Sequence, residues 1–192
     1  QIAEIEVVVP AEGQSEIELM MPVWSPGFYR VQDYAEKVEE ISATTAEGEA
    51  LEVEKASPNR WRVHSGGSPE IRVTYRLHCP DSFVTTNWVS ADLLVLNGSA
   101  TYMTLAGAEE RPHEVWLEPA ATWSAVATGL PKVQGSGPHH YFADDFDTLV
   151  DAPIVAGDLE VTTFLVDGVE HQLVDVGERE AWDPEQAAED LH

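Results

Sequence analysis

"IRVTYRL" at residues 71–77 shows the pattern that decides the fold of this chain. Apolar side chains stand there at every second position, namely Ile71, Val73, Tyr75 and Leu77. Because successive side chains of a β-strand point to opposite faces, this alternation predicts an antiparallel strand with one buried and one exposed face.

The same period of two recurs along most of the chain. Segments 5–9, 17–21, 93–96, 99–105, 159–166 and 169–176 are further strand candidates. Asp167-Gly168 and Asn97-Gly98 each separate two such segments, and both pairs favour the positive φ angles of a type I′ turn. We therefore predict two β-hairpins there. About a dozen strand candidates at short spacing predict an all-β fold, either a β-sandwich or a large curved antiparallel sheet.

Helix is scarce in this sequence. One short helix is predicted within residues 144–153, where Pro153 ends it. A second begins near the C-terminus, because Asp183 is a good N-cap and Pro184 suits the first helical position. We predict a β-rich N-terminal domain over residues 1–182. Residues 183–192 are predicted to start a helix that leads into a following domain.

The strongly negative charge of the chain excludes some classes of binding partner. Its 35 acidic and 10 basic residues give a net charge of −25. Such a field repels nucleic acids and anionic lipids, so we expect neither as a partner. No apolar run is long enough to span a membrane. The sequence predicts a soluble protein and leaves open whether its compartment is the bacterial cytoplasm or the periplasm.

The sequence offers only weak candidates for a metal-binding site or a catalytic nucleophile. His113-Glu114 begins like a zinc-peptidase motif, but position 117 is leucine where a second histidine is needed. His139 and His140 lie close to three aspartates, yet neighbouring strand residues point to opposite faces. We favour a polar surface loop there, and a self-contained metalloenzyme is the alternative. Cys79, the only cysteine, is predicted to be a buried spectator thiol. No catalytic residue, metal or cofactor is expected in this chain itself.

A sharp corner is predicted at Ser25-Pro26-Gly27. Proline presets φ at the second position of a type II turn, and glycine supplies the positive φ needed at the third. Trp24 is predicted to cover the core beside this corner. Tyr29 and Arg30, just past the corner, are the candidates for facing another domain.

Several segments resemble one known family. "PVWSPGFYRVQDYA" (22–35) is similar to a signature near the start of glycyl aminopeptidases, metallopeptidase family 61. Four later segments resemble the landmarks of that family in the same order: "NRWRV" (59–63), "VTYRL" (73–77), "NGSATYM" (97–103) and "FDTLVDAPIVAGD" (146–158). The resemblance covers nearly the whole chain. Phe28 and Gln32 depart from it, because the family more often has a small polar residue and an arginine there.

The resemblance implies a domain of a longer enzyme. In the family, a β-rich N-terminal domain precedes a thermolysin-like zinc domain with a His-Glu-x-x-His motif, usually with a PDZ-like domain as well. This chain would then be the non-catalytic N-terminal domain of a zinc-dependent aminopeptidase, acting as scaffold and as one wall of the substrate cleft. Its partners would be its own catalytic domain, which holds the zinc, and the peptide substrate. A fragment that exposes its docking face is also expected to self-associate.

By analogy with related zinc aminopeptidases, a loop of this domain helps to hold the α-ammonium group of the substrate. The candidates for this cleft wall are Asn97, Gly98 and Ser99, with backbone carbonyls as acceptors. The alternative for these residues is a hairpin tip without a further role. The alternative for the whole chain is a free-standing β-sandwich that binds carbohydrate or protein on exposed aromatics, namely Trp61, Trp88 and Trp123.

Overall fold

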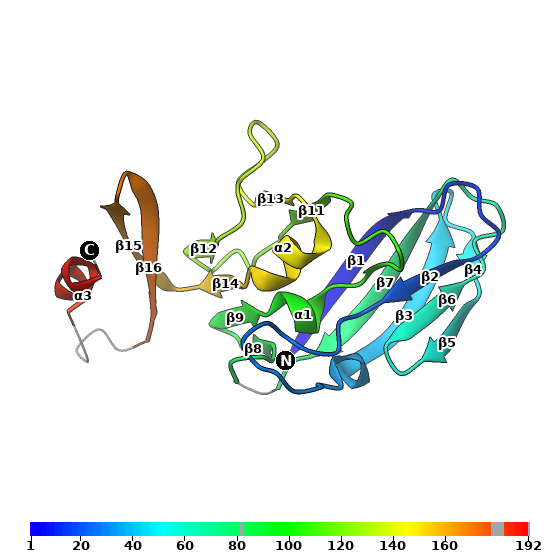
Figure 1. The fold of residues 1–192 in the computed structure, drawn as a ribbon, viewed down its shortest axis with the longest axis horizontal. Helices are drawn as coiled ribbons and strands as arrows, with labels where there is room; N and C mark the ends of the chain where they lie inside the picture. The colour runs from blue at the N-terminus through cyan, green and yellow to red at the C-terminus, as the bar shows by residue number, and fades with distance from the viewer. Residues whose placement is uncertain (81–82, 178–182, 192) are drawn as a thin grey trace.

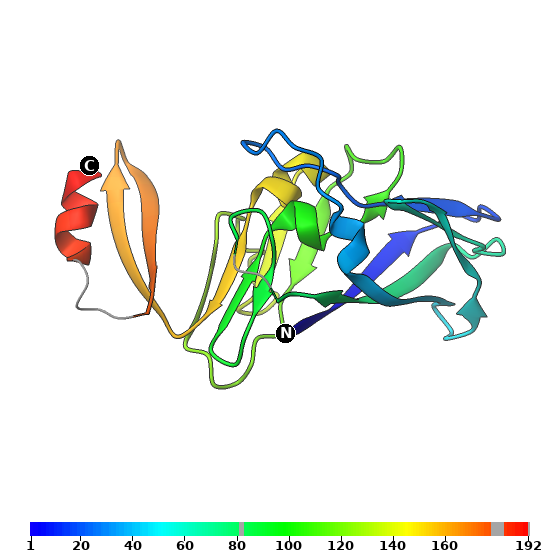
Figure 2. The same cartoon turned by 90° about the horizontal axis from the view of Figure 1, so that it is seen from below.

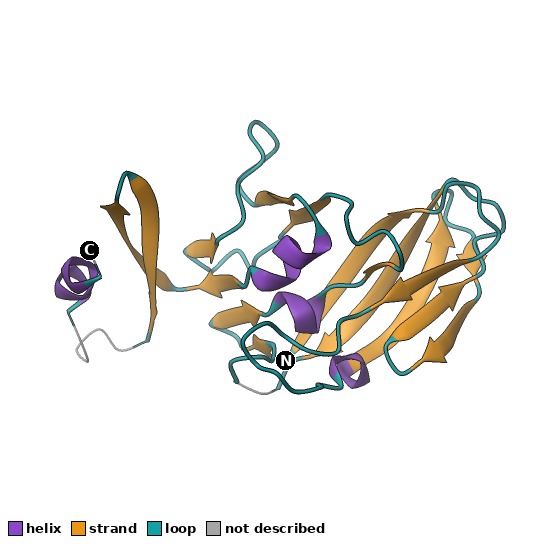
Figure 3. Cartoon of the chain, in the orientation of Figure 1, coloured by secondary structure: helices purple, strands orange, loops and turns teal. Residues whose placement is uncertain are grey.

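The computed structural model describes residues 1–80, 83–177 and 183–191 and confirms the all-β class (Figures 1 and 3). Strands make up 46% of the structure and helices 11%. The described helices are short: η1 (Tyr34–Lys37, 3₁₀), α1 (Gly98–Thr101), α2 (Phe146–Asp151) and α3 (Pro184–Asp190). None of them is long or apolar enough to cross a membrane.

Two four-stranded antiparallel sheets build the main core (Figures 1 and 2). One has the order β1 (Ile2–Pro10), β7 (Glu70–His78), β3 (Val38–Thr45) and β4 (Ala50–Leu51). The other has the order β10 (Thr104–Leu105), β2 (Ile17–Met20), β6 (Arg60–Val63) and β5 (Val53–Ser57). Their inner side chains join in a single hydrophobic cluster, so the two sheets form a sandwich.

Strand β7 has the burial that its alternation predicts. Its four apolar side chains at 71, 73, 75 and 77 are at most 1% exposed, whereas its arginines face outward. Full burial of such a side chain contributes roughly 1.5–3 kcal/mol. On the outer face, the Arg72 guanidinium donates to the Glu6 carboxylate over 2.5 Å, across the β1–β7 pair. The alternation therefore sets which face of this central strand enters the core.

Two further antiparallel sheets are formed by the part of the chain after β7. One sheet has the order β12 (Ala125–Thr128), β14 (Ile154–Gly157), β9 (Leu93–Leu96) and β8 (Trp88–Val89). Beside it, β11 (His113–Trp116) pairs with β13 (His140–Ala143). A second apolar cluster centred on Tyr141, Phe146 and Leu149 connects these strands to α2. The predicted short helix before Pro153 is thus confirmed as α2.

The hairpin predicted at Asn97-Gly98 is wrong. Asn97 has φ −88° and precedes α1, and β9 pairs with β8 and β14 instead of with the segment after it. Gly98 is present for a different reason. A Cβ on Gly98 would lie 2.5 Å from the Cα of Val150 in α2, so only glycine allows α1 and α2 to pack this closely.

The hairpin predicted at Asp167-Gly168 is confirmed. Both residues have positive φ, 51° and 82°, and they connect β15 (Leu159–Val166) to β16 (Val169–Val176). These two strands and α3 stand apart from the main body in both views (Figures 1 and 2). The predicted start of α3 is also confirmed, because the Asp183 carboxylate accepts from the backbone N–H groups of Glu185 and Gln186. The domain boundary predicted at residue 182 lies outside the described residues.

Candidate docking surface

The corner at residues 25–28 is a rigid turn. The Phe28 N–H donates to the Ser25 carbonyl over 3.2 Å, and Gly27 has φ 79°. The Ser25 hydroxyl is buried and lies 2.5 Å from the hydroxyl of Tyr34 in η1. The predicted turn is confirmed, and its hydrogen bond to η1 fixes the direction in which the corner projects.

Aromatic side chains at this corner are exposed. Trp24 is 49% exposed and Tyr29 is 85% exposed, and their rings stack at 6.3 Å. The prediction that Trp24 covers the core is wrong, because nearly half of its surface is exposed, whereas Met21, three residues earlier, is fully buried. Tyr29 and Arg30 are exposed. That they face another domain stays a prediction.

A second loop extends this apolar surface. Phe83 contacts the Phe28 ring edge-on at 5.8 Å, and the Arg30 guanidinium lies 6.0 Å from the same ring. We call this surface the aromatic corner and define it as Trp24, Phe28, Tyr29, Arg30, Val31, Phe83 and Val84. Single exposed apolar side chains are ordinary on a protein surface, but a contiguous group with an arginine is typical of an interaction site.

The cleft candidates Asn97, Gly98 and Ser99 lie in and before α1 and are largely enclosed. Ser99 is 2% exposed and Gly98 is buried. The Asn97 carbonyl accepts from the Ala100 N–H and from the Thr101 hydroxyl, and the Gly98 carbonyl accepts from the Tyr102 N–H. The two carbonyls predicted to hold a substrate ammonium group are therefore engaged within α1. Their role in a substrate cleft stays a prediction.

Asn87 is the residue that holds this segment, and the sequence did not single it out. Its side-chain oxygen accepts from the Asn97 N–H over 2.8 Å, and its amide nitrogen donates to the Ala100 carbonyl over 3.0 Å. The side chain is 7% exposed, so these bonds satisfy a buried amide. Asn87 lies 10 and 13 residues before its two partners, and no local pattern predicts their contact.

A small depression lies between η1 and α1. Its volume is about 200 Å³, and Gln32, Asp33 and Tyr34 line it together with Asn87 and Ala100. It places the segment that follows the aromatic corner beside the α1 segment. The two groups of residues singled out from the sequence therefore lie in neighbouring parts of the molecule.

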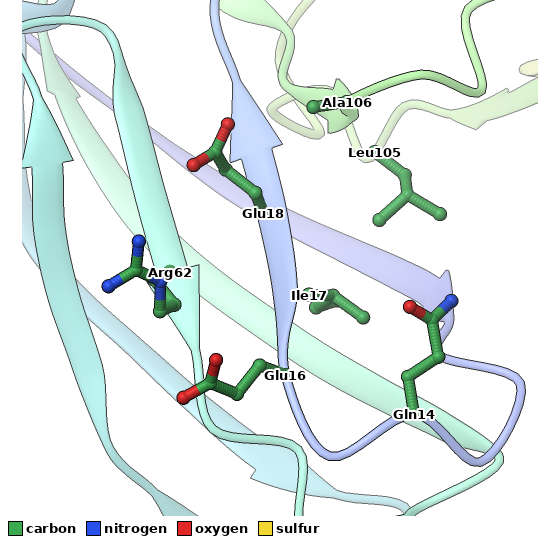
Figure 4. Close-up of a pocket in the computed structure, with 7 residues that line it drawn as sticks. All are labelled: Gln14, Glu16, Ile17, Glu18, Arg62, Leu105 and Ala106. Carbon is green, nitrogen blue, oxygen red and sulfur yellow. The ribbon is translucent and has the colours of Figure 1, made fainter.

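A second depression, of about 260 Å³, lies over β2 and β6 and is acidic (Figure 4). Two of its carboxylates already have side-chain partners in the sheet. The Glu18 carboxylate lies 2.6 Å from the Arg60 guanidinium, and the Glu16 carboxylate lies 2.9 Å from the His64 imidazole. Both carboxylates are therefore engaged by neighbouring side chains of the sheet.

His139 and His140 do not form a metal centre with the nearby aspartates. The buried His140 ring stacks on Trp116 at 4.0 Å, and its Nε2 lies 2.8 Å from the Glu114 carboxylate. Its Nδ1 is hydrogen-bonded to the Ser136 hydroxyl. Among the described residues, no three histidine, cysteine, aspartate or glutamate side chains are grouped so that they could hold a metal ion.

The tryptophan platform of the binding-module alternative is wrong. Trp61 is 2% exposed and belongs to the main core, with the Lys55 ammonium 4.1 Å from its ring centre. Trp88 and Trp123 are half-buried, and the Trp123 indole N–H donates to the Ala91 carbonyl. The predicted burial of Cys79 is confirmed, and this burial raises the pKa of its thiol.

Comparison with known proteins agrees with this architecture. A solved structure of an aminopeptidase N family protein from Idiomarina loihiensis is similar, with a TM-score of 0.89 and 28% sequence identity. The match covers 99% of this chain but only 32% of that protein, so this chain spans about a third of the length of its structural relative. No curated protein matches significantly. The family described as Peptidase M61 N-terminal domain matches residues 1–158, and the chain belongs to this family.

Proposed function

We propose that this chain is the N-terminal domain of a zinc-dependent aminopeptidase, in which it packs against the catalytic domain and forms one wall of the substrate cleft. The observation that supports this proposal is the aromatic corner, an exposed apolar surface on a rigid turn. A rigid, partly aromatic surface loses little conformational entropy on docking. Membership of a peptidase family and the greater length of the structural relative favour a catalytic domain of the same chain as the partner.

The described residues offer no ligand set for zinc, so the following domain would supply the metal ligands and the general base. Zinc in such a domain would polarise the scissile carbonyl and lower the pKa of a bound water. This chain would contribute by positioning the substrate. A wall fixed to the catalytic domain excludes water and limits where the N-terminus of a peptide can lie.

The test compares this chain with the longer protein. Purified residues 1–192 and the full-length protein are assayed with glycine p-nitroanilide and are analysed for zinc by mass spectrometry. We expect one zinc and chelator-sensitive hydrolysis in the full-length protein and neither in residues 1–192. Hydrolysis by residues 1–192 alone, or a full-length protein that is active after complete removal of zinc, would overturn the proposal.

A further inference from the structure

The strands β15 and β16 form a two-stranded sheet, and the two faces of β15 differ in exposure. Along β15 the side chains at 161, 163 and 165 are exposed, whereas those at 160, 162, 164 and 166 are half-buried. The helix α3 contacts β15, and the half-buried side chains of β15, Phe164 among them, share one face of the strand. The opposite face is open, and we call it the open face.

The open face carries several exposed apolar side chains. Val161 and Leu165 of β15 are 37% and 57% exposed, and Val176 of β16 is 50% exposed. Val161 pairs with Val174, and Leu159 pairs with Val176, so the end of this face near Leu159 forms an apolar cross-strand group. Towards the turn, Leu165 pairs with Glu170. An isolated two-stranded hairpin is marginally stable in water, and it usually gains stability from further strands or from a packed layer. Among the described elements, α3 contacts β15, and β12 contacts it as well, with Leu159 at the start of β15 buried.

The position of this unit in the chain points to what covers the open face. The match to the N-terminal domain family ends at residue 158, and β15 begins at Leu159. The structural relative matches 99% of this chain, so it contains counterparts of β15, β16 and α3, yet this match is only 32% of its length. The hairpin and helix are thus shared with a protein about three times as long, but they lie beyond the N-terminal domain.

We infer that residues 159–190 are the first hairpin and helix of the next domain, and that the rest of that domain, from the same chain, packs on the open face. The N-terminal domain then ends near residue 158 instead of at residue 182. The inference needs the longer chain of the proposed function but is independent of its zinc chemistry, and its test uses no assay of activity.

Hydrogen exchange of the full-length protein and of residues 1–192 provides the test. We expect backbone amides of β15 and β16 to exchange on the order of 100-fold faster in residues 1–192, because their protection comes from the missing layer. Amides of β1 and β7 should exchange equally in both proteins. Equal protection of β15 and β16 in the two proteins, or a gene that ends at His192, would overturn the inference.

Substitutions on the open face give a second measurement. In the full-length protein, Val161→Ser combined with Leu165→Ser should restore fast exchange in β15, whereas the control Val169→Ser on the other face should not. Light scattering of residues 1–192 detects the rival occupant, a second copy of this chain. A dimer that the Leu165→Ser variant dissociates, together with unchanged exchange in the full-length protein, would contradict the assignment.

Discussion

Gly98 occupies a position where no side chain has room. A Cβ there would lie 2.5 Å from the Val150 Cα and 2.6 Å from the Leu149 carbonyl oxygen, both of which belong to the backbone of α2. Backbone atoms cannot rotate aside as a flexible side chain can. We therefore expect Gly98→Ala to lower the free energy of unfolding by roughly 1–3 kcal/mol, the usual cost of overpacking a core. Urea unfolding followed by tryptophan fluorescence measures this loss.

The matched control is Gly129→Ala. An added Cβ at Gly129 meets nothing within 4 Å, and the residue has no positive φ. Its substitution should leave the unfolding midpoint nearly unchanged. If Gly98→Ala and Gly129→Ala behave alike, close packing between α1 and α2 does not determine the choice of glycine at position 98.

His113 makes the stability dependent on pH. Burial lowers the pKa of its imidazole, although the nearby Arg111 backbone and the Asp145 carboxylate oppose this effect. A histidine in the unfolded chain has a pKa of about 6.5. The unfolded state therefore binds the proton first as the pH falls, and the folded state loses stability between pH 6.5 and the lower pKa of the folded state.

The contribution of His113 is measured as a difference in unfolding free energy between two proteins. Unfolding free energies of the wild type and of His113→Asn are recorded from pH 8 to pH 5, and the wild type should lose more stability across that range. Subtracting the variant removes the common effect of the many carboxylates. A constant difference would show that the burial of this ring does not affect its titration.

At the scale of residues, the sequence predicts positions whose reason is local. Ser25-Pro26-Gly27 forms a turn because of its own φ preferences, and the burial of Cys79 follows from its place at the end of an alternating strand. Trp24 is a residue whose exposure the local sequence does not predict. Its sequence neighbours do not reveal that the chain leaves the core between the buried Met21 and the exposed Trp24.

The helix α2 depends on one capping side chain. The Asp145 carboxylate accepts from the Thr148 N–H over 2.7 Å, and this bond lowers the pKa of the carboxyl group. We expect Asp145→Ala to shift the urea midpoint downward at neutral pH, because an N–H at the start of the helix loses its acceptor. The variant Asp145→Asn keeps an acceptor and should stay close to the wild type. Equal losses for both would show that charge, and not capping, stabilises α2.

At the scale of elements, alternation predicts strands well and their partners poorly. The Asp167-Gly168 turn joins neighbouring strands, so its local signal is sufficient. The same kind of turn signal predicts a hairpin wrongly at Asn97-Gly98, because β9 pairs with β14, which lies far along the chain. Gly98 serves the contact with α2, and a contact between distant segments leaves no local pattern.

At the scale of the whole molecule, the alternating pattern predicts the sandwich but not where it ends. Residues 159–176 alternate as the earlier strands do, so they read as part of the same β-rich domain. Their assignment to the following domain, as inferred above, rests only on the exposure of Val161 and Leu165 and on the extent of the family match. The aromatic corner was foreseen only in part, through Tyr29 and Arg30, because Phe83 joins it from a distant loop.

The aromatic corner leads to a prediction for the full-length protein. Tyr29 and Val31 are 85% and 76% exposed, so replacing both by serine should leave the unfolding of residues 1–192 almost unchanged. In the full-length protein the same change would leave a docked surface without its apolar contacts. We therefore expect a lower unfolding temperature and faster proteolysis between the domains. Val8→Ser on β1, where the wild-type side chain is 49% exposed, is the control and should alter neither protein. If the double variant is as neutral in the full-length protein as in residues 1–192, the catalytic domain does not dock on this corner.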